Sequence, residues 1–183
     1  MGPPETRQRF EEIYMTHYSA VSSYVTRRTV SPDDIADVIA ETFMTAWRRL
    51  TDIPSGDEAR LWLYGVARRV LANHYRAESR RTALAIRLRE NLTLWAESVV
   101  DQPHDAARAA FSRLSDEDRE LLSLVGWEGL GTAEIAKVLG CSRGAVRIRL
   151  HRARKRLAAE LATAELDLTR YGTRAVALAK ESS

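Results

Sequence analysis

The residues that could do chemistry in this sequence are concentrated near one end of the chain. Positions 142–157 contain seven basic side chains and no acidic one. Arginine forms paired hydrogen bonds with phosphate oxygens and with the O6 and N7 atoms of guanine. A merely solvated helix face would usually alternate glutamate with arginine. The basic block therefore favours a nucleic acid as the ligand.

Residue types that would support catalysis or metal binding are sparse. Cys141 is the single cysteine, which excludes an internal disulfide framework and a multi-cysteine zinc site. The four histidines lack the spacing of paired metal ligands. Asp33, Asp34 and Asp37 could imitate the carboxylate cluster of a small nuclease, but no second acidic cluster has suitable spacing. We therefore expect no enzyme activity, no metal and no cofactor.

The composition fits an ordinary globular protein. Of the 183 residues, 45% are hydrophobic and 29% are charged, with a formal net charge of +3. This length suits one domain or two small ones. No apolar run approaches the ~18 residues that a membrane span needs, and the acidic start does not resemble a signal peptide. We expect a soluble, cytoplasmic chain without membrane insertion.

The elements that carry these residues are predicted to be helices. Apolar residues recur at three- and four-residue spacing over 11–28, 31–50 and 59–81. Ser31 followed by Pro32 predicts a helix start, since serine caps the first turn and proline fits the first helical position. No segment shows sustained two-residue alternation, so strands are not expected.

The second half of the chain predicts a helix-turn-helix. Ser115 is expected to cap a helix, and amphipathic helices are expected over 132–139 and 143–157. A three-residue connection containing Gly140 would join the last two helices, which is the layout of that motif. The alternative is a helical hairpin with a solvated arginine face.

Stretches in both halves are similar to a known family. Residues 37–48 (DVIAETFMTAWR) and 62–73 (WLYGVARRVLAN) resemble region 2 of the sigma-70 transcription initiation factors. Residues 114–122 (LSDEDRELL) and 146–154 (VRIRLHRAR) resemble region 4 of the same family. Nothing in the sequence resembles a region 1 extension, and there is no room for a full region 3. The chain therefore resembles the small extracytoplasmic-function (ECF, group 4) sigma factors, in a form typical of actinobacteria.

The resemblance implies an all-α fold with two small helical domains joined by a linker. Its expected parts are region 2 at 5–81, a linker at 82–105, region 4 at 106–160 and a tail at 161–183. For the tail, a fraying extension is favoured over a regulatory device. Two positions depart from the family pattern: Ala40 stands where glutamine is frequent, and Arg149, which follows Ile148, is expected to alter phosphate contacts.

The implied function is that of a sigma factor, which directs core RNA polymerase to promoters, recognises their −35 and −10 elements and assists melting. The implied partners are the clamp helices of the largest polymerase subunit, the flap region of the second-largest subunit, promoter DNA and an anti-sigma factor. Polymerase binding is expected at Asp34, Asp37 and Glu41. Phe43 and Trp47 are expected to be core anchors rather than contacts.

The DNA-binding residues implied by the resemblance fall in both domains. The loop 51–59 would capture an unstacked base of the −10 element, with an extrusion cost of a few kcal/mol offset by a close-fitting pocket. The −10 strand is expected to follow Arg68, Arg69, Asn73, Arg76 and Arg80, of which Asn73 would read a base edge or serve as a satisfied polar residue. The −35 element is expected to contact Ser142, Arg143, Val146, Arg147, Arg149, His151, Arg152 and Arg154. Arg152, Arg154 and also Arg156 lie further along the helix, where it is expected to leave the groove and pass phosphates.

A stand-alone helix-turn-helix regulator is the main alternative. Such a regulator usually binds paired half-sites as a dimer. The sequence has no heptad seam and no ligand domain that would support this. Binding to core polymerase would separate the two interpretations.

Overall fold

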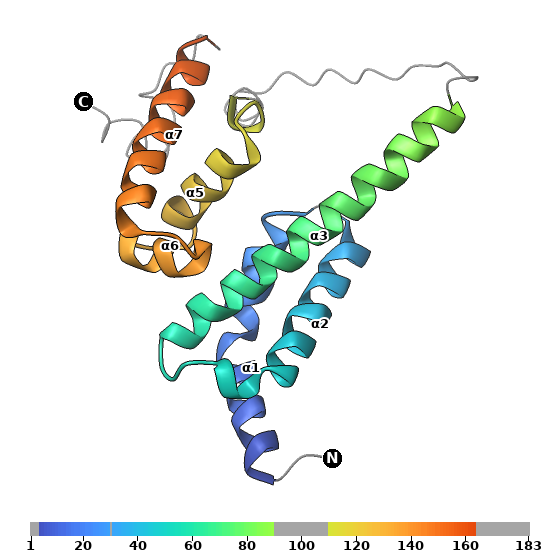
Figure 1. The fold of residues 1–183 in the computed structure, drawn as a ribbon, viewed down its shortest axis with the longest axis vertical. Helices are drawn as coiled ribbons and strands as arrows, with labels where there is room; N and C mark the ends of the chain where they lie inside the picture. The colour runs from blue at the N-terminus through green and yellow to red at the C-terminus, as the bar shows by residue number, and fades with distance from the viewer. Residues whose placement is uncertain (1–3, 30, 90–109, 164–183) are drawn as a thin grey trace. The chain divides into compact units, whose positions relative to one another are not determined.

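The computed structural model describes residues 4–29, 31–89 and 110–163, and in these ranges the chain forms helices and no strand (Figure 1). The chain divides into two compact units, Met1–Trp95 and Ala96–Ser183, which are described separately. The predicted all-α class is confirmed.

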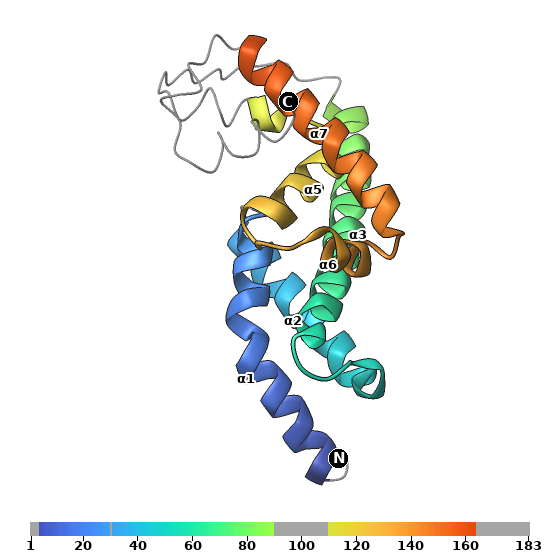
Figure 2. The same ribbon diagram turned by 90° about the vertical axis from the view of Figure 1, so that its left-hand side faces the viewer.

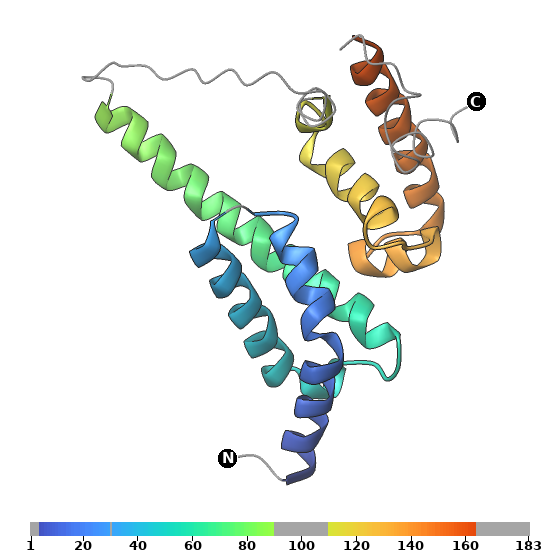
Figure 3. The ribbon, with the colours of Figure 1, turned by 180° about the vertical axis from the view of Figure 1, so that it is seen from behind.

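The first unit consists of three long helices and a short 3-10 turn. They are α1 (Pro4–Thr26), α2 (Pro32–Arg48), η1 (Leu50–Asp52) and α3 (Glu58–Arg89). Each helix packs against the other two, as Figures 1 and 3 show. The core comprises Val21, Tyr24 and Val25 of α1, Val38, Phe43 and Ala46 of α2, and Leu63, Tyr64, Ala67 and Val70 of α3. Burial of these apolar faces holds the three helices together.

Local sequence signals set the start of α2. The Ser31 hydroxyl accepts a hydrogen bond from the backbone N–H of Asp34 at 3.4 Å, and Pro32 occupies the first helical position. This bond confirms the cap predicted from the sequence. The cap stabilises the helix because it satisfies one of the N–H groups that a helix leaves unpaired at its start.

The ends of two helices differ from the sequence prediction. The first helix begins at Pro4 rather than near residue 11. The third continues past Arg81 to Arg89. Residues 82–89 are rich in alanine, leucine and arginine, which are strong helix formers, so nothing in that stretch ends the helix. Of the predicted linker, residues 90–105 lie outside the described residues. The same holds for the tail from residue 164.

The second unit contains α5 (Asp116–Gly126), α6 (Thr132–Leu139) and α7 (Arg143–Thr163). Both α5 and α6 pack against α7 (Figure 2). Their shared core includes Leu121, Leu122 and Leu124 of α5, Ile135 and Val138 of α6, and Val146, Leu150, Ala153, Leu157 and Leu161 of α7. Because Leu161 is buried, α7 extends beyond the predicted end at Leu157.

The turn between α6 and α7 is the predicted helix-turn-helix connection. Gly140 ends α6 with φ of +65°, a left-handed conformation that favours glycine. The next N–H, of Cys141, donates to the Ala136 carbonyl at 3.0 Å. Ser142 then starts α7, where its hydroxyl accepts from the Ala145 N–H at 3.1 Å. Residues 140–142 therefore fix the direction in which α7 leaves α6.

Candidate nucleic-acid interface

Helix α7 has one buried and one exposed face. Val146, Leu150, Ala153 and Leu157 are buried, and this three- and four-residue spacing marks a single side of the helix. The exposed side carries most of the predicted −35 residues: Ser142, Arg143, Arg147, Arg149, His151 and Arg152. The Arg143 Nε donates to the Thr132 hydroxyl at 3.3 Å, which joins the first turns of α6 and α7. The result is a rigid helix that presents guanidinium groups to an external ligand.

Val146 does not belong to this exposed surface. Its side chain is 0% exposed, so the predicted DNA contact at this position is wrong. The residue packs in the core and holds the neighbouring Arg147 outward. The predicted contact Arg154 is half-buried.

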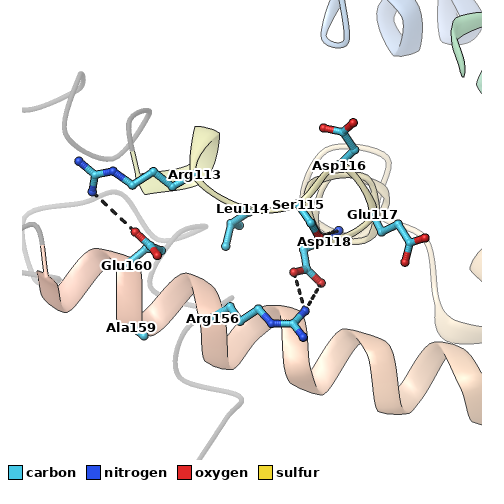
Figure 4. A pocket seen from close by; sticks show the side chains of 9 residues that line it. All are labelled: Arg113, Leu114, Ser115, Asp116, Glu117, Asp118, Arg156, Ala159 and Glu160. Carbon is cyan, nitrogen blue, oxygen red and sulfur yellow. Dashed lines mark hydrogen bonds and ion pairs between the residues drawn. The ribbon is translucent and has the colours of Figure 1, made fainter. Parts of the chain in front are cut away.

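Arg156, which the sequence places near the phosphates, is engaged inside the domain. Its Nη1 donates to both carboxylate oxygens of Asp118, at 2.9 and 2.7 Å (Figure 4). The Asp118 side chain is 6% exposed and the Arg156 side chain 59%. Asp118 lies three and four residues ahead of Leu121 and Leu122, on their helix face. The sequence signal for this ion pair is the acidic residue Asp118 on the apolar face of the predicted helix.

An open hollow surrounds this ion pair. It is lined by Arg113, Leu114, Ser115, Asp116, Glu117, Asp118, Arg156, Ala159 and Glu160 (Figure 4). Arg113 and Glu160 form a second ion pair across it at 3.7 Å. Charged side chains of both signs line the hollow. The two ion pairs join the second half of α7 to the start of α5 and to the residues just before it.

The predicted −10 residues lie along α3. Arg69 and Arg76 are exposed, and their Nε atoms donate to the carbonyls of Gly65 at 2.9 Å and Ala72 at 3.1 Å. Exposed Asn73 accepts from Arg76 Nη2 at 3.1 Å. Arg68 is half-buried, and the Arg80 side chain lies outside the described residues. Residues 69, 73 and 76 share one face of α3 by their spacing.

The three acidic residues of α2 that are predicted to bind polymerase divide into two groups. Asp37 and Glu41 are exposed and four residues apart, on one face of the helix. Asp34 is half-buried, with its Oδ1 3.6 Å from His74 Nε2 on α3. Two of the three predicted polymerase-binding acids therefore form a common exposed flank, whereas the third faces α3.

The aromatic residues of α2 also differ from each other. Phe43 is buried beside Tyr14, at 4.7 Å between ring centroids, as expected of a core anchor. Trp47 is 41% exposed, so its prediction as a core anchor is only partly right. Its ring makes an edge contact with Phe10 of α1, at 5.1 Å between ring centroids.

The segment between α2 and α3 has a buried base and an exposed tip. Leu50 and Ile53 point into the core, and residues 55–57 are exposed. Gly56 has a φ of +67°, and its carbonyl accepts from the Ala59 N–H at 3.1 Å. Arg9 Nη2 of α1 donates to the Ile53 carbonyl at 2.7 Å. Sequence reasoning missed Arg9, since nothing local signals a contact across 44 residues.

A histidine of α1 lies near the end of the same segment. Burial lowers the pKa of His17 from its ordinary value of 6.5, the charge of Arg60 lowers it further, and Asp57 opposes both effects. Residues 57 and 60 flank the start of α3, so α1 interacts electrostatically with that start as well.

Comparison with known protein families identifies both units. The model of sigma-70 region 2 matches residues 13–81, and that of sigma-70 region 4 matches residues 104–157. The ECF RNA polymerase sigma factor SigF of Caulobacter vibrioides is 30% identical over 144 residues, which cover 78% of this chain and 79% of that protein. The chain belongs to the sigma-70 family, among the ECF-type sigma factors.

A further relative supports the same family, and a solved structure has the same fold. The RNA polymerase sigma factor YlaC of Bacillus subtilis is 29% identical over 160 residues, covering 82% of this chain and 91% of YlaC. The sigma factor RpoE of Bartonella quintana, solved with the anti-sigma factor NepR, has the same fold with a TM-score of 0.58 and 21% identity, covering 86% of this chain and 98% of RpoE. The protein is an RNA polymerase sigma factor, and the stand-alone regulator is not favoured.

The described part of the sigma factor contains neither a candidate metal site nor a candidate membrane span. No group of three or more histidine, cysteine, aspartate or glutamate side chains within it could hold a metal ion. Among its described helices, none combines the length and the apolar character that crossing a membrane requires.

Proposed function

We propose that the two domains of this sigma factor recognise separate promoter elements while the first also holds core polymerase. The proposed domains are region 2 at 5–81 and region 4 at 106–160, with a linker at 82–105 and a tail at 161–183. The observation that carries the proposal is α7, whose exposed face bears arginines and whose opposite face is buried. A helix held in this way suits the major groove of DNA.

In region 4, α7 would read the −35 element. Arg143 and Arg147 lie near its N-terminal end, which enters the groove in this motif. They would donate to guanine O6 and N7. The remaining contacts, to phosphates and base edges, would come from Ser142, Arg149, His151, Arg152 and Arg154. Val146 would act only by packing behind Arg147.

In region 2, the segment 51–59 and α3 would handle the −10 element. The exposed tip at 55–57 would receive an unstacked base. Arg68, Arg69, Asn73, Arg76 and Arg80 would follow the DNA strand. The bond of Arg76 to a carbonyl of its own helix is exposed, so exchanging it for a phosphate contact costs little net free energy, whereas the equivalent bond of Arg69 is part-buried.

Polymerase binding would use the exposed acidic flank of α2. Asp37 and Glu41 would pair with basic residues on the clamp helices of the largest subunit, and Asp34 would contribute less because it faces His74. Region 4 would contact the flap region of the second-largest subunit. In this mechanism the sigma factor catalyses no covalent step and needs no cofactor.

A charge reversal tests the polymerase flank. The double variant Asp37→Arg/Glu41→Arg should lose affinity for core polymerase and fail to form open complexes, because like charges would face the clamp. The matched control Glu5→Arg/Glu12→Arg makes the same charge change on exposed positions of α1 and should bind normally. A double variant on α2 that is folded by circular dichroism and binds polymerase like the parent would refute the assignment.

Regulation by an anti-sigma factor is part of the proposal. The solved sigma factor RpoE, which has this fold, was crystallised in complex with the anti-sigma factor NepR. Met44 and Trp47 of α2 and the arginines of α7 offer exposed apolar and basic surfaces for such a partner. Co-purification from the native host should yield an anti-sigma factor. Full activity of the free factor in cells, with no partner recovered, would contradict this part.

We also assign the protein to group 4, to the cytoplasm and to an actinobacterial source. The protein must be in the cytoplasm to act on core polymerase. All but three of the 28 basic residues are arginine, which fits the source. Fractionation of the native host, followed by detection of the protein with core polymerase, tests the location.

A further inference from the structure

Helix α1 contacts the segment that joins α2 and α3 and also the end of α2 that leads into it. Arg9 donates to the Ile53 carbonyl, and the next residue, Phe10, packs its ring against Trp47 at the end of α2. Two turns later along α1, the charges of Arg60 and Asp57 act on the pKa of His17. Helix α1 therefore contacts the segment near its entry out of α2, and its His17 lies within electrostatic range of the exit into α3.

The contact of Arg9 fixes the backbone immediately before the exposed tip. At 2.7 Å the bond is shorter than the usual 2.9–3.0 Å of a neutral N–H···O bond, as expected for a charged donor. The Ile53 side chain is buried, and its N–H donates to Leu50 O at 3.3 Å. Side chain, N–H and carbonyl of this one residue are therefore all held.

The backbone is restricted on both sides of the tip. Before the tip, Pro54 follows Ile53 and restricts its own φ. The Gly56 carbonyl then accepts from Ala59 at the start of α3. Between these two anchors only a short stretch is exposed. A receptor ordered before its ligand arrives avoids the ordering cost at binding.

We propose that Arg9 is a positioning residue for recognition of the −10 element, because its bond to Ile53 O holds the base-capturing tip in place. This inference rests on the proposed function of segment 51–59. Arg9 acts through the backbone and does not itself contact the captured base. Since it is exposed and basic, the competing role is a direct contact with a DNA phosphate, and the two roles make opposite predictions.

The test uses polymerase holoenzyme and a library of single-stranded oligonucleotides randomised over the −10 element. Arg9→Ala should weaken the base preference at the captured position by about fivefold to tenfold, the effect of losing one charge-assisted hydrogen bond. Arg9→Lys should retain most of the preference, because its ammonium can still donate one bond. Arg7→Ala is the matched control: it removes the same charge from α1, but Arg7 pairs with Glu11 of its own helix at 2.9 Å.

A second measurement follows the tip itself. Hydrogen exchange at the amides of Ile53 and Ala59 should be faster in Arg9→Ala and unchanged in Arg7→Ala, with both variants folded by circular dichroism. Unchanged exchange and an unchanged base preference would overturn the inference. Equal loss of affinity for all oligonucleotides, with a smaller salt slope, would instead make Arg9 a phosphate contact.

Substitutions in the tip distinguish this failure from failure of the proposed function. Ser55→Ala/Asp57→Ala should alter the −10 preference if the segment captures the base. If these variants change the preference and Arg9→Ala does not, only the role of Arg9 is wrong. If the tip variants leave the preference intact, the assignment of segment 51–59 is wrong, and this role of Arg9 with it.

Discussion

Adjacent residues of α7 have opposite roles. Val146 is fully buried, whereas Arg147 is exposed. We predict that Arg147→Ala weakens binding to the −35 element by about 1–3 kcal/mol and relaxes the preference at particular positions, because a paired contact with a base edge is lost. Binding of holoenzyme to a library of −35 mutants measures both effects. A uniform loss without a change in preference would mean that another face of α7 reads the bases.

Arg152 is the comparison for Arg147. It is also exposed but lies more than a turn further along α7, where the helix leaves the groove. Arg152→Ala should weaken binding to all −35 sequences about equally and lower the salt slope by roughly 1, as removal of one phosphate contact does. A salt series on the same library tests this, and a selective loss at one base position would contradict it.

His17 gives the first domain a dependence on pH. Because its folded pKa is lowered from 6.5, the unfolded chain binds more protons as the pH falls below that value. The stability that this group contributes is complete above pH 6.5 and is lost as the pH falls from there to the lowered pKa. Urea unfolding should show that His17→Gln, which cannot titrate, loses less stability than the parent over this window. Parallel pH profiles would contradict the prediction.

At the scale of elements, the ion pair between α5 and α7 ties the second helix of the helix-turn-helix to the rest of its domain. Asp118 lies in the first turn of α5, and Arg156 in the second half of α7. Arg156→Ala leaves a buried carboxylate without its guanidinium partner, a change that costs far more than the loss of an exposed pair. Since Arg156 is itself largely exposed, we expect the smaller cost of about 1–3 kcal/mol in stability of the second domain.

Thermal unfolding followed by circular dichroism checks this cost. The −35 preference of Arg156→Ala should be unchanged below its melting temperature, because the residue braces the fold rather than contacting DNA. Arg152→Ala should alter stability by no more than about 0.5 kcal/mol. A stable Arg156→Ala variant with weaker binding to every promoter would restore the role as a phosphate contact.

Local signals account for the elements that could be predicted from the sequence. The helix starts after Ser31 and Ser115 and the turn at Gly140 depend on hydrogen bonds within a few residues, which a short stretch of sequence reveals. The bonds of Arg9 to Ile53 and of Arg156 to Asp118 join residues 44 and 38 positions apart, so they depend on how the helices pack. For the same reason the exposure of Asp37 and Glu41 was predictable from helical spacing, whereas the turn of Asp34 toward His74 was not.

At the scale of the molecule, two small units each offer a limited surface to DNA. We predict that the isolated sigma factor binds promoter DNA weakly and with strong salt dependence, since most of its affinity would come from arginine–phosphate contacts. Addition of core polymerase should give specific open complexes, detectable by footprinting with permanganate. Tight, sequence-specific binding by the lone protein at physiological salt would favour the stand-alone regulator instead.

The division of α7 into a buried stripe and an outward face has an evolutionary consequence. Substitutions at outward positions such as 143 and 147 remove no core contact, and changes at sites without shared partners add nearly independently. Promoter preference can therefore drift step by step while the fold keeps its stability margin. The same separation makes the helix a starting point for engineering sets of orthogonal sigma factors, in which several outward residues are exchanged together and each variant ignores the promoters of the others.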